Sequence, residues 1–319
     1  MDMGFWGKLK KPFSVLAPME GVTDTVFRQV IMSVARPDVF FTEFTSVNGM
    51  CSPGLEKVAE RLKYAESEKP IVAQIWGTDP ELFYKAGRMV SEMKFDGIDI
   101  NMGCPVRDVV RQGGGSALIG KMSQVREIIS ATIDGAGRLP VSVKTRIGRQ
   151  KIETEEWIGF LLGQQLAAVT IHARTAAEMS KVPAHREEVK IAVGLKKQIK
   201  SPTLIIGNGD IKSIYDSRLM IYESGVDGVM IGRGIFENPA AFDRSGKILP
   251  ATERLDLLLK HLDLFEKQRD AFYKPFAEFR KFIKIYANGF SGAAGLRQKL
   301  MAAETAAAVR KIVIGIRGS

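Results

Sequence analysis

The chain has 319 residues, of which 45% are hydrophobic, enough for one large α/β domain or two smaller ones. A charged fraction of 26% argues against disorder, and two cysteines are too few for a disulfide framework or a structural zinc site. The N-terminus lacks an apolar run typical of a signal peptide, and no apolar stretch reaches the roughly 18 residues of a membrane span. We therefore expect a cytoplasmic protein.

The formal net charge of +10 is unevenly distributed along the chain. Residues 250–319 hold 13 lysines and arginines against 7 acidic residues, whereas residues 1–249 hold 33 against 29. A basic C-terminal part is typical of a protein with a polyanionic partner.

Eight short apolar runs predict strands that are buried on both faces. They span residues 14–18, 39–44, 71–76, 97–101, 141–145, 168–172, 203–207 and 228–232. Amphipathic segments with helical spacing lie between them, for example at 24–35, 81–93, 124–136, 186–199 and 217–225. Thr23-Asp24, Asp79-Pro80 and Ser123 resemble helix N-caps.

This alternation predicts an α/β fold with a parallel sheet, and eight strands match a (β/α)8 TIM barrel. A doubly wound open sheet is the alternative, but no G-x-G-x-x-G follows the first strand. Residues 243–253 resemble a linker, and only helical periodicity continues from Arg254. We predict a catalytic barrel over residues 1–245 and a helical bundle domain over 246–319.

Polar residues gather where the predicted strands end, which is the catalytic face of a barrel. Singly, each has an ordinary explanation: Lys144 could extend its amine to solvent, and His172 could be a hydrogen-bonded core histidine. Their coincidence at strand ends favours a site. They are Pro18, Met19, Glu20, Glu43, Gln74, Asn101, Cys104, Lys144, His172, Arg174, Asn208, Gly209, Asp210, Gly232 and Arg233.

The segments "IIGNGDI" and "MIGRGIF" place glycines directly after the seventh and eighth strands. Glycine lets backbone N–H groups approach an anion, and these two loops form the common phosphate site of the fold. Arg233 would add a charge-assisted contact. Lys144 would suit the negative charge of a reduced flavin, and Gln74 its pyrimidine edge. Spacing alone leaves a phosphorylated sugar substrate equally open.

Nearly the whole chain resembles the flavin-dependent tRNA-dihydrouridine synthases. The matching segments are "APMEGVTDTVFR", "DINMGCPV", "GGGSAL", "VSVKTRIG", "TIHART", "IIGNGDI", "VMIGRG" and "FRKFIKIYANGFSGAAGLRQKL". The resemblance implies reduction of a tRNA uridine to 5,6-dihydrouridine. NADPH would reduce bound FMN, the flavin would pass hydride to C6, and Cys104 would donate the proton at C5. A thiol with a pKa near ~8.5 is mostly protonated at neutral pH and so serves as an acid.

The resemblance also implies a role for each matching position. Gly103 would let the loop approach the substrate, and Pro105 would hold Cys104 still. The flavin would be lined by Pro18, Met19 and Glu20, contacted at its ring by Gln74 and Lys144, and flanked by His172. Its phosphate end would be held by Asn208, Gly209, Asp210, Gly232 and Arg233. Asn101 would orient the uracil, and Arg174 would assist the substrate or the phosphate.

The target base must leave its stack, so the folded RNA must be held elsewhere through its phosphates. Arg280, Lys281 and Lys284 lie within little more than one helical turn and would provide that contact, although a solvated charged face is the ordinary interpretation. We expect Phe276, Phe279, Phe282 and Ile283 to form the bundle core. Neither a protein partner nor a metal site is indicated, and Cys51 is expected to be a small packed cysteine.

Two positions depart from the family pattern: Arg186 stands near the place of an expected tryptophan, and Phe282 replaces a histidine. Two other functions remain open. A flavin barrel acting on a free small-molecule pyrimidine, such as a dihydroorotate or dihydropyrimidine oxidoreductase, would share the barrel and a loop cysteine but would not need a basic helical domain. A non-catalytic RNA-binding protein would leave Cys104 and Lys144 unexplained.

Overall fold

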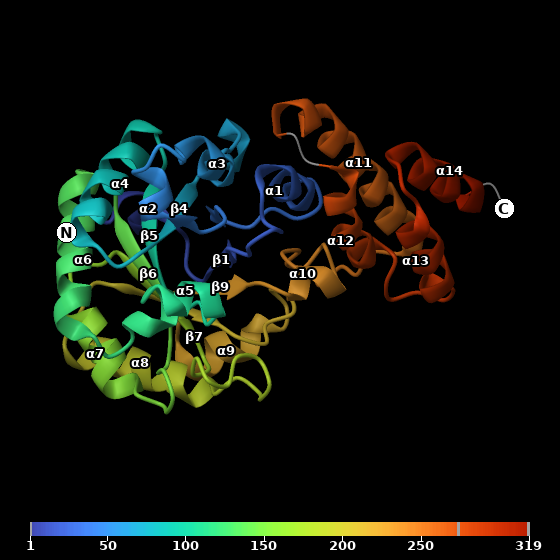
Figure 1. Ribbon diagram of the computed structural model, residues 1–319. Coiled ribbons are helices and arrows are strands. Elements are labelled where there is room, and N and C mark those ends of the chain that lie inside the picture. The colour runs from blue at the N-terminus through green and yellow to red at the C-terminus, as the bar shows by residue number, and fades with distance from the viewer. Residues whose placement is uncertain (1, 273–274, 318–319) are drawn as a thin grey trace.

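The computed structural model describes residues 2–272 and 275–317. Its centre is a barrel of parallel strands surrounded by helices, with further helices at the C-terminal end (Figure 1). The strands are β1 Phe13–Leu16, β2 Phe40–Phe41, β3 Thr45–Ser46, β4 Ile71–Trp76, β5 Gly97–Met102, β6 Val141–Arg146, β7 Ala168–His172, β8 Leu204–Asn208 and β9 Gly228–Ile231.

The strand order β1-β9-β8-β7-β6-β5-β4-β2 is that of a barrel, and β3 also pairs with β4. The ring closes between β1 and the residue before β2, where Val15 forms a parallel bridge with Val39. The predicted (β/α)8 barrel is therefore confirmed. Of the run expected as one strand over 39–44, only Phe40 and Phe41 form a strand, β2, preceded by the bridge residue Val39, and β3 follows beyond the run at Thr45–Ser46.

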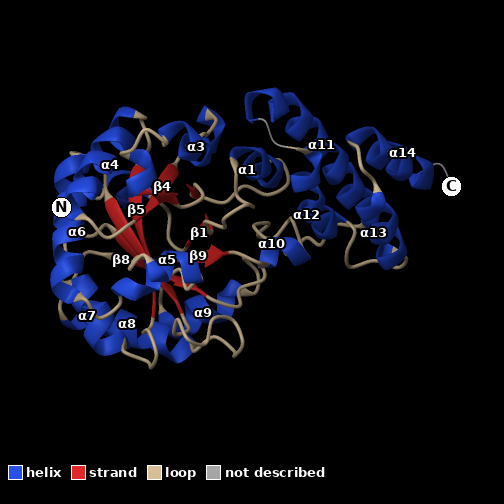
Figure 2. Ribbon diagram, in the orientation of Figure 1, coloured by secondary structure: helices blue, strands red, loops and turns tan. Residues whose placement is uncertain are grey.

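The helices cover the outside of the barrel (Figure 2). Asp24 and Asp79 cap α1 and α4 as predicted, whereas Ser123 lies inside α6, whose N-cap is Lys121. The barrel helices are α1 Thr25–Met32, α2 Val47–Met50, α3 Leu55–Ala59, α4 Pro80–Glu92, α5 Arg107–Arg111, α6 Met122–Ala136, α7 Thr154–Leu162, α8 Arg186–Gln198, α9 Ser217–Ser224 and α10 Gly234–Glu237; short 3-10 turns lie at Gly4–Lys8, Glu60–Leu62, Glu66–Glu68 and Gly115–Leu118.

Two apolar clusters form the core. One fills the layer between strands and helices. The other fills the lower barrel interior, where Trp6, Phe13, Phe41, Ile206 and Met230 pack together. Above this interior cluster the inward-facing positions become polar, because alternate residues of β4 to β8 there are glutamine, aspartate, serine, lysine, histidine and asparagine. The barrel thus has an apolar floor and a polar mouth.

Four C-terminal helices extend from the side of the barrel next to α1 and α10 (Figure 1): α11 Ala251–Phe272, α12 Phe276–Tyr286, α13 Ala293–Ala302 and α14 Ala306–Arg317. The first begins at Ala251, inside the expected linker. Phe27 of α1 stacks on Phe282 of α12 with ring centroids 5.3 Å apart. Phe279, Phe282 and Ile283 are buried, as predicted for the bundle core.

Buried Arg254 fastens these helices to the barrel. Its guanidinium donates to the carbonyl oxygens of Leu249, Glu237 and Ile285, at 3.0, 2.7 and 3.2 Å. These three carbonyls belong to the connecting segment, α10 and α12 respectively, so one side chain joins all three.

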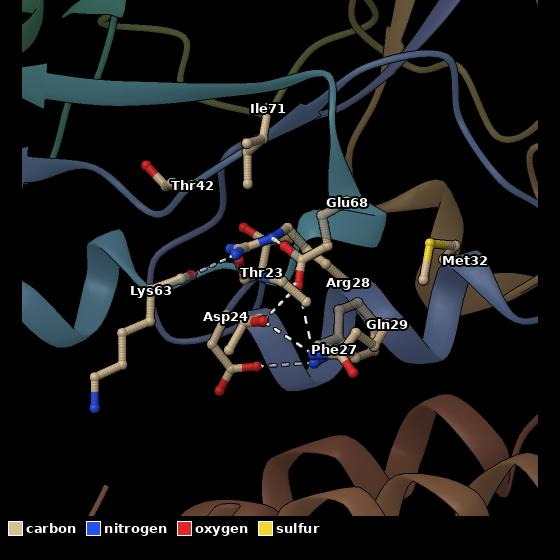
Figure 3. Close-up of polar contacts among 12 residues, drawn as sticks. Thr23, Asp24, Phe27, Arg28, Gln29, Met32, Thr42, Lys63, Glu68 and Ile71 are labelled. Atoms are coloured by element: carbon tan, nitrogen blue, oxygen red, sulfur yellow. Dashed lines mark hydrogen bonds and ion pairs between the residues drawn. The ribbon is translucent and has the colours of Figure 1, made fainter. Parts of the chain in front are cut away.

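A second buried arginine holds the segment after β1 (Figure 3). Arg28 and Glu68 are both fully buried, and Arg28 Nε lies 2.5 Å from Glu68 Oε2. The remaining guanidinium nitrogens donate to the carbonyls of Thr23 and Lys63 at 2.6 and 2.7 Å. The pair therefore links the β1–α1 loop to residues 63–68. Within the described part of the chain, none of the helices is both long and apolar enough to cross a membrane.

Candidate active site

A cavity of about 500 Å³ opens at the C-terminal ends of the barrel strands, within the usual size of cofactor sites. Loops after β1, β8 and β9 form its walls, and β6 and β7 contribute side chains from below. Every predicted cofactor residue except Glu20 and Gln74 lines it. These residues are Pro18, Met19, Lys144, His172, Asn208, Gly209, Asp210, Gly232 and Arg233.

Two glycines of this wall are required by the backbone. Gly209 has φ +121°, and a Cβ on Gly234 would lie 2.4 Å from the carbonyl oxygen of Lys212. A Cβ on Gly232 would instead meet only Ala17 and Met19 at ordinary distances. The β8 and β9 loops thus pack backbone against backbone and leave main-chain groups at the cavity, as a phosphate cradle requires.

Lys144 supplies a cation from the cavity floor. Its Nζ lies 3.3 Å from Asn208 Oδ1, and Asn208 in turn donates to the Met230 carbonyl at 2.8 Å. Burial, and then the charge of Arg146, lower the pKa of Lys144 to about 8. The amine is therefore mostly charged at pH 7 and lacks a carboxylate hydrogen-bond partner among the described residues, which makes it responsive to a bound anion.

His172 is neutral at pH 7. Burial lowers its pKa well below the ordinary value, and four nearby cations act in the same direction. Arg174 Nη1 lies 3.2 Å from His172 Nε2. Because a guanidinium only donates, Nε2 accepts and the ring proton sits on Nδ1.

Arg174, predicted to contact substrate or phosphate, lies behind the cavity wall. It is 2% exposed, donates to the Val182 carbonyl at 2.6 Å and pairs with Asp210. Asp210 adopts a left-handed φ of +50° and also accepts from the Ala184 amide. Its carboxylate is 3.8 Å from Arg233, so it orients two arginines. Because a carboxylate repels an anion, any effect of Asp210 on a phosphate in this cavity would pass through Arg233.

Cys104 stands two residues beyond β5, on the same rim. It is half-buried, and burial raises the pKa of its thiol, which is therefore protonated at neutral pH. The Cys104 carbonyl accepts from the Ser116 amide at 2.9 Å, and a Cβ on Gly115 would lie 2.6 Å from that oxygen. A Cβ on Gly103 would lie 3.2 Å from the Thr145 backbone, so Gly103 serves close packing on β6.

Asn101 and Gln74 form a buried amide pair beneath the cysteine loop. Asn101 Oδ1 accepts from the amides of Gly103 and Cys104 at 3.1 and 2.9 Å. Asn101 Nδ2 donates to Gln74 Oε1 at 3.1 Å. Each amide nitrogen carries two protons and uses one in these contacts; Asn101 is 6% exposed, whereas Gln74 is fully buried.

Glu20, predicted to line the flavin, points elsewhere. Its carboxylate is exposed and pairs with Arg61, with Oε1 and Nη2 2.7 Å apart. The neighbouring Gly21 amide donates to the buried Glu43 carboxylate. These contacts fix the β1–α1 loop at the cavity mouth.

Sequence analysis missed Arg146. This buried arginine donates to the carbonyls of Gly103, Thr175 and Met179 at 2.9, 3.0 and 2.9 Å. It thereby joins the cysteine loop to the loop after β7. Arg146 follows Lys144 by two residues on the same strand, so both side chains lie on the same face of the sheet. This alternation could have identified Arg146 from the sequence.

The predicted RNA-binding lysines lie at the edge of this site. Lys281 Nζ is 3.3 Å from the place a Cβ on Gly21 would occupy, and Lys284 Nζ lies 6.0 Å from the ring centroid of Phe236. Phe236 itself lines the cavity. Both lysines are exposed, and Arg280 is half-buried. Cys51 packs half-buried against the core, with its sulfur 3.7 Å from the Leu82 carbonyl.

The fold and the site define a TIM-barrel enzyme with two glycine loops, a buried cation and a thiol on one rim. The dihydrouridine synthase (Dus) family model matches residues 15–314, and the chain belongs to this family. The prediction of a flavin-dependent, tRNA-dihydrouridine synthase-type oxidoreductase is therefore confirmed.

Curated relatives agree with this assignment, and a solved structure shares the fold. A probable tRNA-dihydrouridine synthase of Staphylococcus aureus (strain COL) is 46% identical over 98% of this chain and 95% of that protein. The probable tRNA-dihydrouridine synthase 2 of Bacillus subtilis (strain 168) is also 46% identical, over 98% and 96%. A variant of NCR from Zymomonas mobilis, 14% identical, matches with TM-score 0.50 over 74% of this chain and 88% of that one, which shows the shared barrel fold.

The family's enzymes depend on FMN and use NAD(P)H, and the residues present fit that cofactor. The cavity is large enough, its glycine loops expose main-chain groups, and Lys144 and Arg233 provide the positive charge that a phosphorylated flavin needs.

Proposed function

We propose that the protein reduces a uridine of tRNA to 5,6-dihydrouridine at the barrel mouth, with Cys104 as the proton donor. The observation that carries this proposal is the arrangement of the rim. Lys144 lines the cofactor cavity from β6, and Asn101, which holds the Cys104 loop, is its register partner on β5. The thiol and the cavity therefore flank one reaction space.

The residues divide the work. Gly209, Gly232 and Arg233 hold the phosphate end, with Asp210 and Arg174 positioning Arg233. Lys144 and His172 line the ring end, where Lys144 stabilises negative charge and neutral His172 donates from Nδ1. When bound, FMN supplies the hydride that reduces C6 of the uracil, and NADPH is the proposed source of its electrons.

Cys104 completes the reduction at C5. Its protonated thiol gives a proton to that carbon as the C5–C6 double bond is lost, and the thiolate then regains a proton from solvent. Burial, which raises the pKa of this thiol, keeps the proton in place until the base arrives.

The proposed RNA contact is the basic face of α12. The chain would then consist of a catalytic barrel, residues 1–245, and a tRNA-binding helical part, residues 246–319. Lys281 and Lys284 border the β1–α1 loop and Phe236, so phosphates near the extruded uridine are their expected partners. Arg280 is closer to the helix core. Because tRNA is the substrate, we place the protein in the cytoplasm.

The acid role is tested with Cys104→Ala, with Cys51→Ala as the matched control. Cys104→Ala is expected to bind FMN and oxidise NADPH normally but to form no dihydrouridine in uridine-containing tRNA, measured by mass spectrometry of digested nucleosides. Cys51→Ala should retain full activity. Full dihydrouridine formation by Cys104→Ala would refute the acid role.

A flavin barrel that reduces a free pyrimidine is the competing function. The double variant Lys281→Glu/Lys284→Glu distinguishes the two functions. It is made in the whole chain, because removing the C-terminal helices would expose Phe27, which stacks on Phe282. We expect weaker tRNA binding with a salt slope shallower by about 1.5, from two lost phosphate contacts. Lys190→Glu/Lys197→Glu, at two exposed positions of α8, is the charge-matched control. An unchanged salt slope would place the RNA elsewhere.

A further inference from the structure

The Cys104 loop is held from below by one side-chain oxygen. Asn101 Oδ1 accepts from the backbone N–H groups of Gly103 and Cys104 at 3.1 and 2.9 Å. Both partners are donors, so the atom facing them must be an acceptor. The orientation of the Asn101 amide is thereby fixed, and its nitrogen must face away from the loop.

A chain of buried hydrogen bonds continues from that nitrogen into the barrel. Asn101 Nδ2 donates to Gln74 Oε1 at 3.1 Å, and Gln74 Nε2 donates to Asp99 Oδ2 at 2.7 Å. The other oxygen of Asp99 accepts from Ser142 Oγ at 2.7 Å. All four side chains are buried, and Gln74, Asp99 and Ser142 are register partners on neighbouring strands.

The direction of this chain is determined at both of its ends. An amide has a donating end and an accepting end, whereas an ionised carboxylate only accepts. Asp99 therefore requires the nitrogen of Gln74, which turns the Gln74 oxygen towards Asn101 and the Asn101 oxygen towards the loop. Reversing either amide alone would place like groups against each other in a buried site, where unpaired polar groups are costly.

We propose that Asp99 is a positioning residue for Cys104, acting through Gln74 and Asn101 to set which end of each amide faces the cysteine loop. This inference rests on the proposed role of Cys104 as proton donor. Asp99 touches neither the substrate nor the thiol. Its contribution is to allow only one hydrogen-bond pattern beneath the loop, so that the thiol is presented in one place.

The test reverses the chain. Asn101→Asp keeps an acceptor for the loop but offers no donor to Gln74, so two acceptors meet. Adding Asp99→Asn repairs this mismatch: Asn at 99 donates to Gln74 Oε1, and Gln74 Nε2 then donates to Asp at 101. The number of buried carboxylates in the double variant equals that of the parent chain. The background is Cys51→Ala, which leaves Cys104 as the only thiol.

The readouts need no RNA: hydrogen exchange of the Gly103 and Cys104 amides, and the alkylation rate of Cys104. Asn101→Asp should raise both about tenfold, the equivalent of one unpaired buried group, and Asp99→Asn alone should change them less than about threefold. Asp99→Asn/Asn101→Asp should return within about threefold of the parent. Ser142→Ala, which removes only the donor at the far oxygen of Asp99, is the matched control and should leave the loop unchanged.

A second pair keeps the inference testable if Asn101→Asp does not fold. Gln74→Glu faces Asp99 with a second carboxylate, and Asp99→Asn restores a donor to it, so Asp99→Asn/Gln74→Glu should again recover the loop. The inference is overturned if neither double variant improves on its damaged single variant, or if exchange rises equally throughout β7. Dihydrouridine formation by Cys104→Ala is scored separately, so failure of this chain is distinct from failure of the proposed acid.

Discussion

The Arg28–Glu68 pair gives the sharpest stability prediction. Glu68 accepts from Arg28, from the Thr25 hydroxyl and from the Ala65 amide, all inside the protein. In Glu68→Gln, the oxygen of the new amide can serve Thr25 and Ala65 only if its nitrogen faces Arg28. Two donors then oppose each other, and the guanidinium keeps its charge without a counter-ion.

The cost follows from complete burial. Both side chains are 0% exposed, so water cannot replace the lost partner, and breaking such a pair from one side costs about 3–5 kcal/mol. A domain of this size loses roughly 2–4 °C per kcal/mol, so the melting temperature should fall by about 10 °C. Because Arg28 also holds the Thr23 carbonyl, the loss should loosen the β1–α1 loop that borders the cavity.

Thermal unfolding followed by circular dichroism measures this effect. Glu81→Gln is the control, because its pair with Lys85 is exposed to solvent and should contribute little to stability. Arg28→Met/Glu68→Leu should recover much of the loss, since it removes both charges together. A melting temperature for Glu68→Gln within about 2 °C of the parent would show that Arg28 finds other compensation, and the reasoning would fail.

Three further predictions concern the cavity and its supports. Burial lowers the pKa of Lys144 to about 8, so the amine loses its charge as pH rises through 8. FMN affinity, measured by fluorescence titration, should therefore fall in that pH range. Lys144→Arg should remove this pH dependence, and an unchanged pH dependence in that variant would contradict the role of the Lys144 charge. Gly234→Ala places a Cβ 2.4 Å from the Lys212 carbonyl and should weaken FMN binding about tenfold or more, whereas Gly194→Ala, whose Cβ meets open space, should not. Arg254→Met leaves three carbonyls without their donor and should cost about 2–4 kcal/mol in urea unfolding; no loss in Arg254→Met, or full stability in Arg254→Lys, would contradict the argument from a planar three-way donor.

The barrel could be predicted from the sequence because strands that are buried on both faces appear in it as short apolar runs. The same logic located the site, since parallel strands must bring their carboxyl ends to one rim. Lys144, His172 and Asn208 line the cavity as expected because each belongs to a strand, where side-chain direction follows from alternation.

In the loops, the orientation of side chains could not be predicted from the sequence. Glu20 turns to Arg61, which belongs to a segment some forty residues away whose placement no local pattern predicts. Arg174 lies just past the end of β7, and its guanidinium is hydrogen-bonded to the Val182 carbonyl and paired with Asp210. Its role depends on where the following loop returns, which is a tertiary property.

The buried arginines also change how the net charge should be interpreted. Arg28, Arg146, Arg174 and Arg254 are each no more than 6% exposed, and all of them donate to backbone carbonyls. They add to the formal charge of +10, but their buried guanidinium groups cannot contact the phosphates of an RNA bound at the surface. Attraction of RNA must therefore come from exposed cations, and Lys281 and Lys284 are placed for it beside the cavity mouth. Charge reversal at those two lysines should consequently weaken tRNA binding more than the same formal change made on α8, in Lys190→Glu/Lys197→Glu.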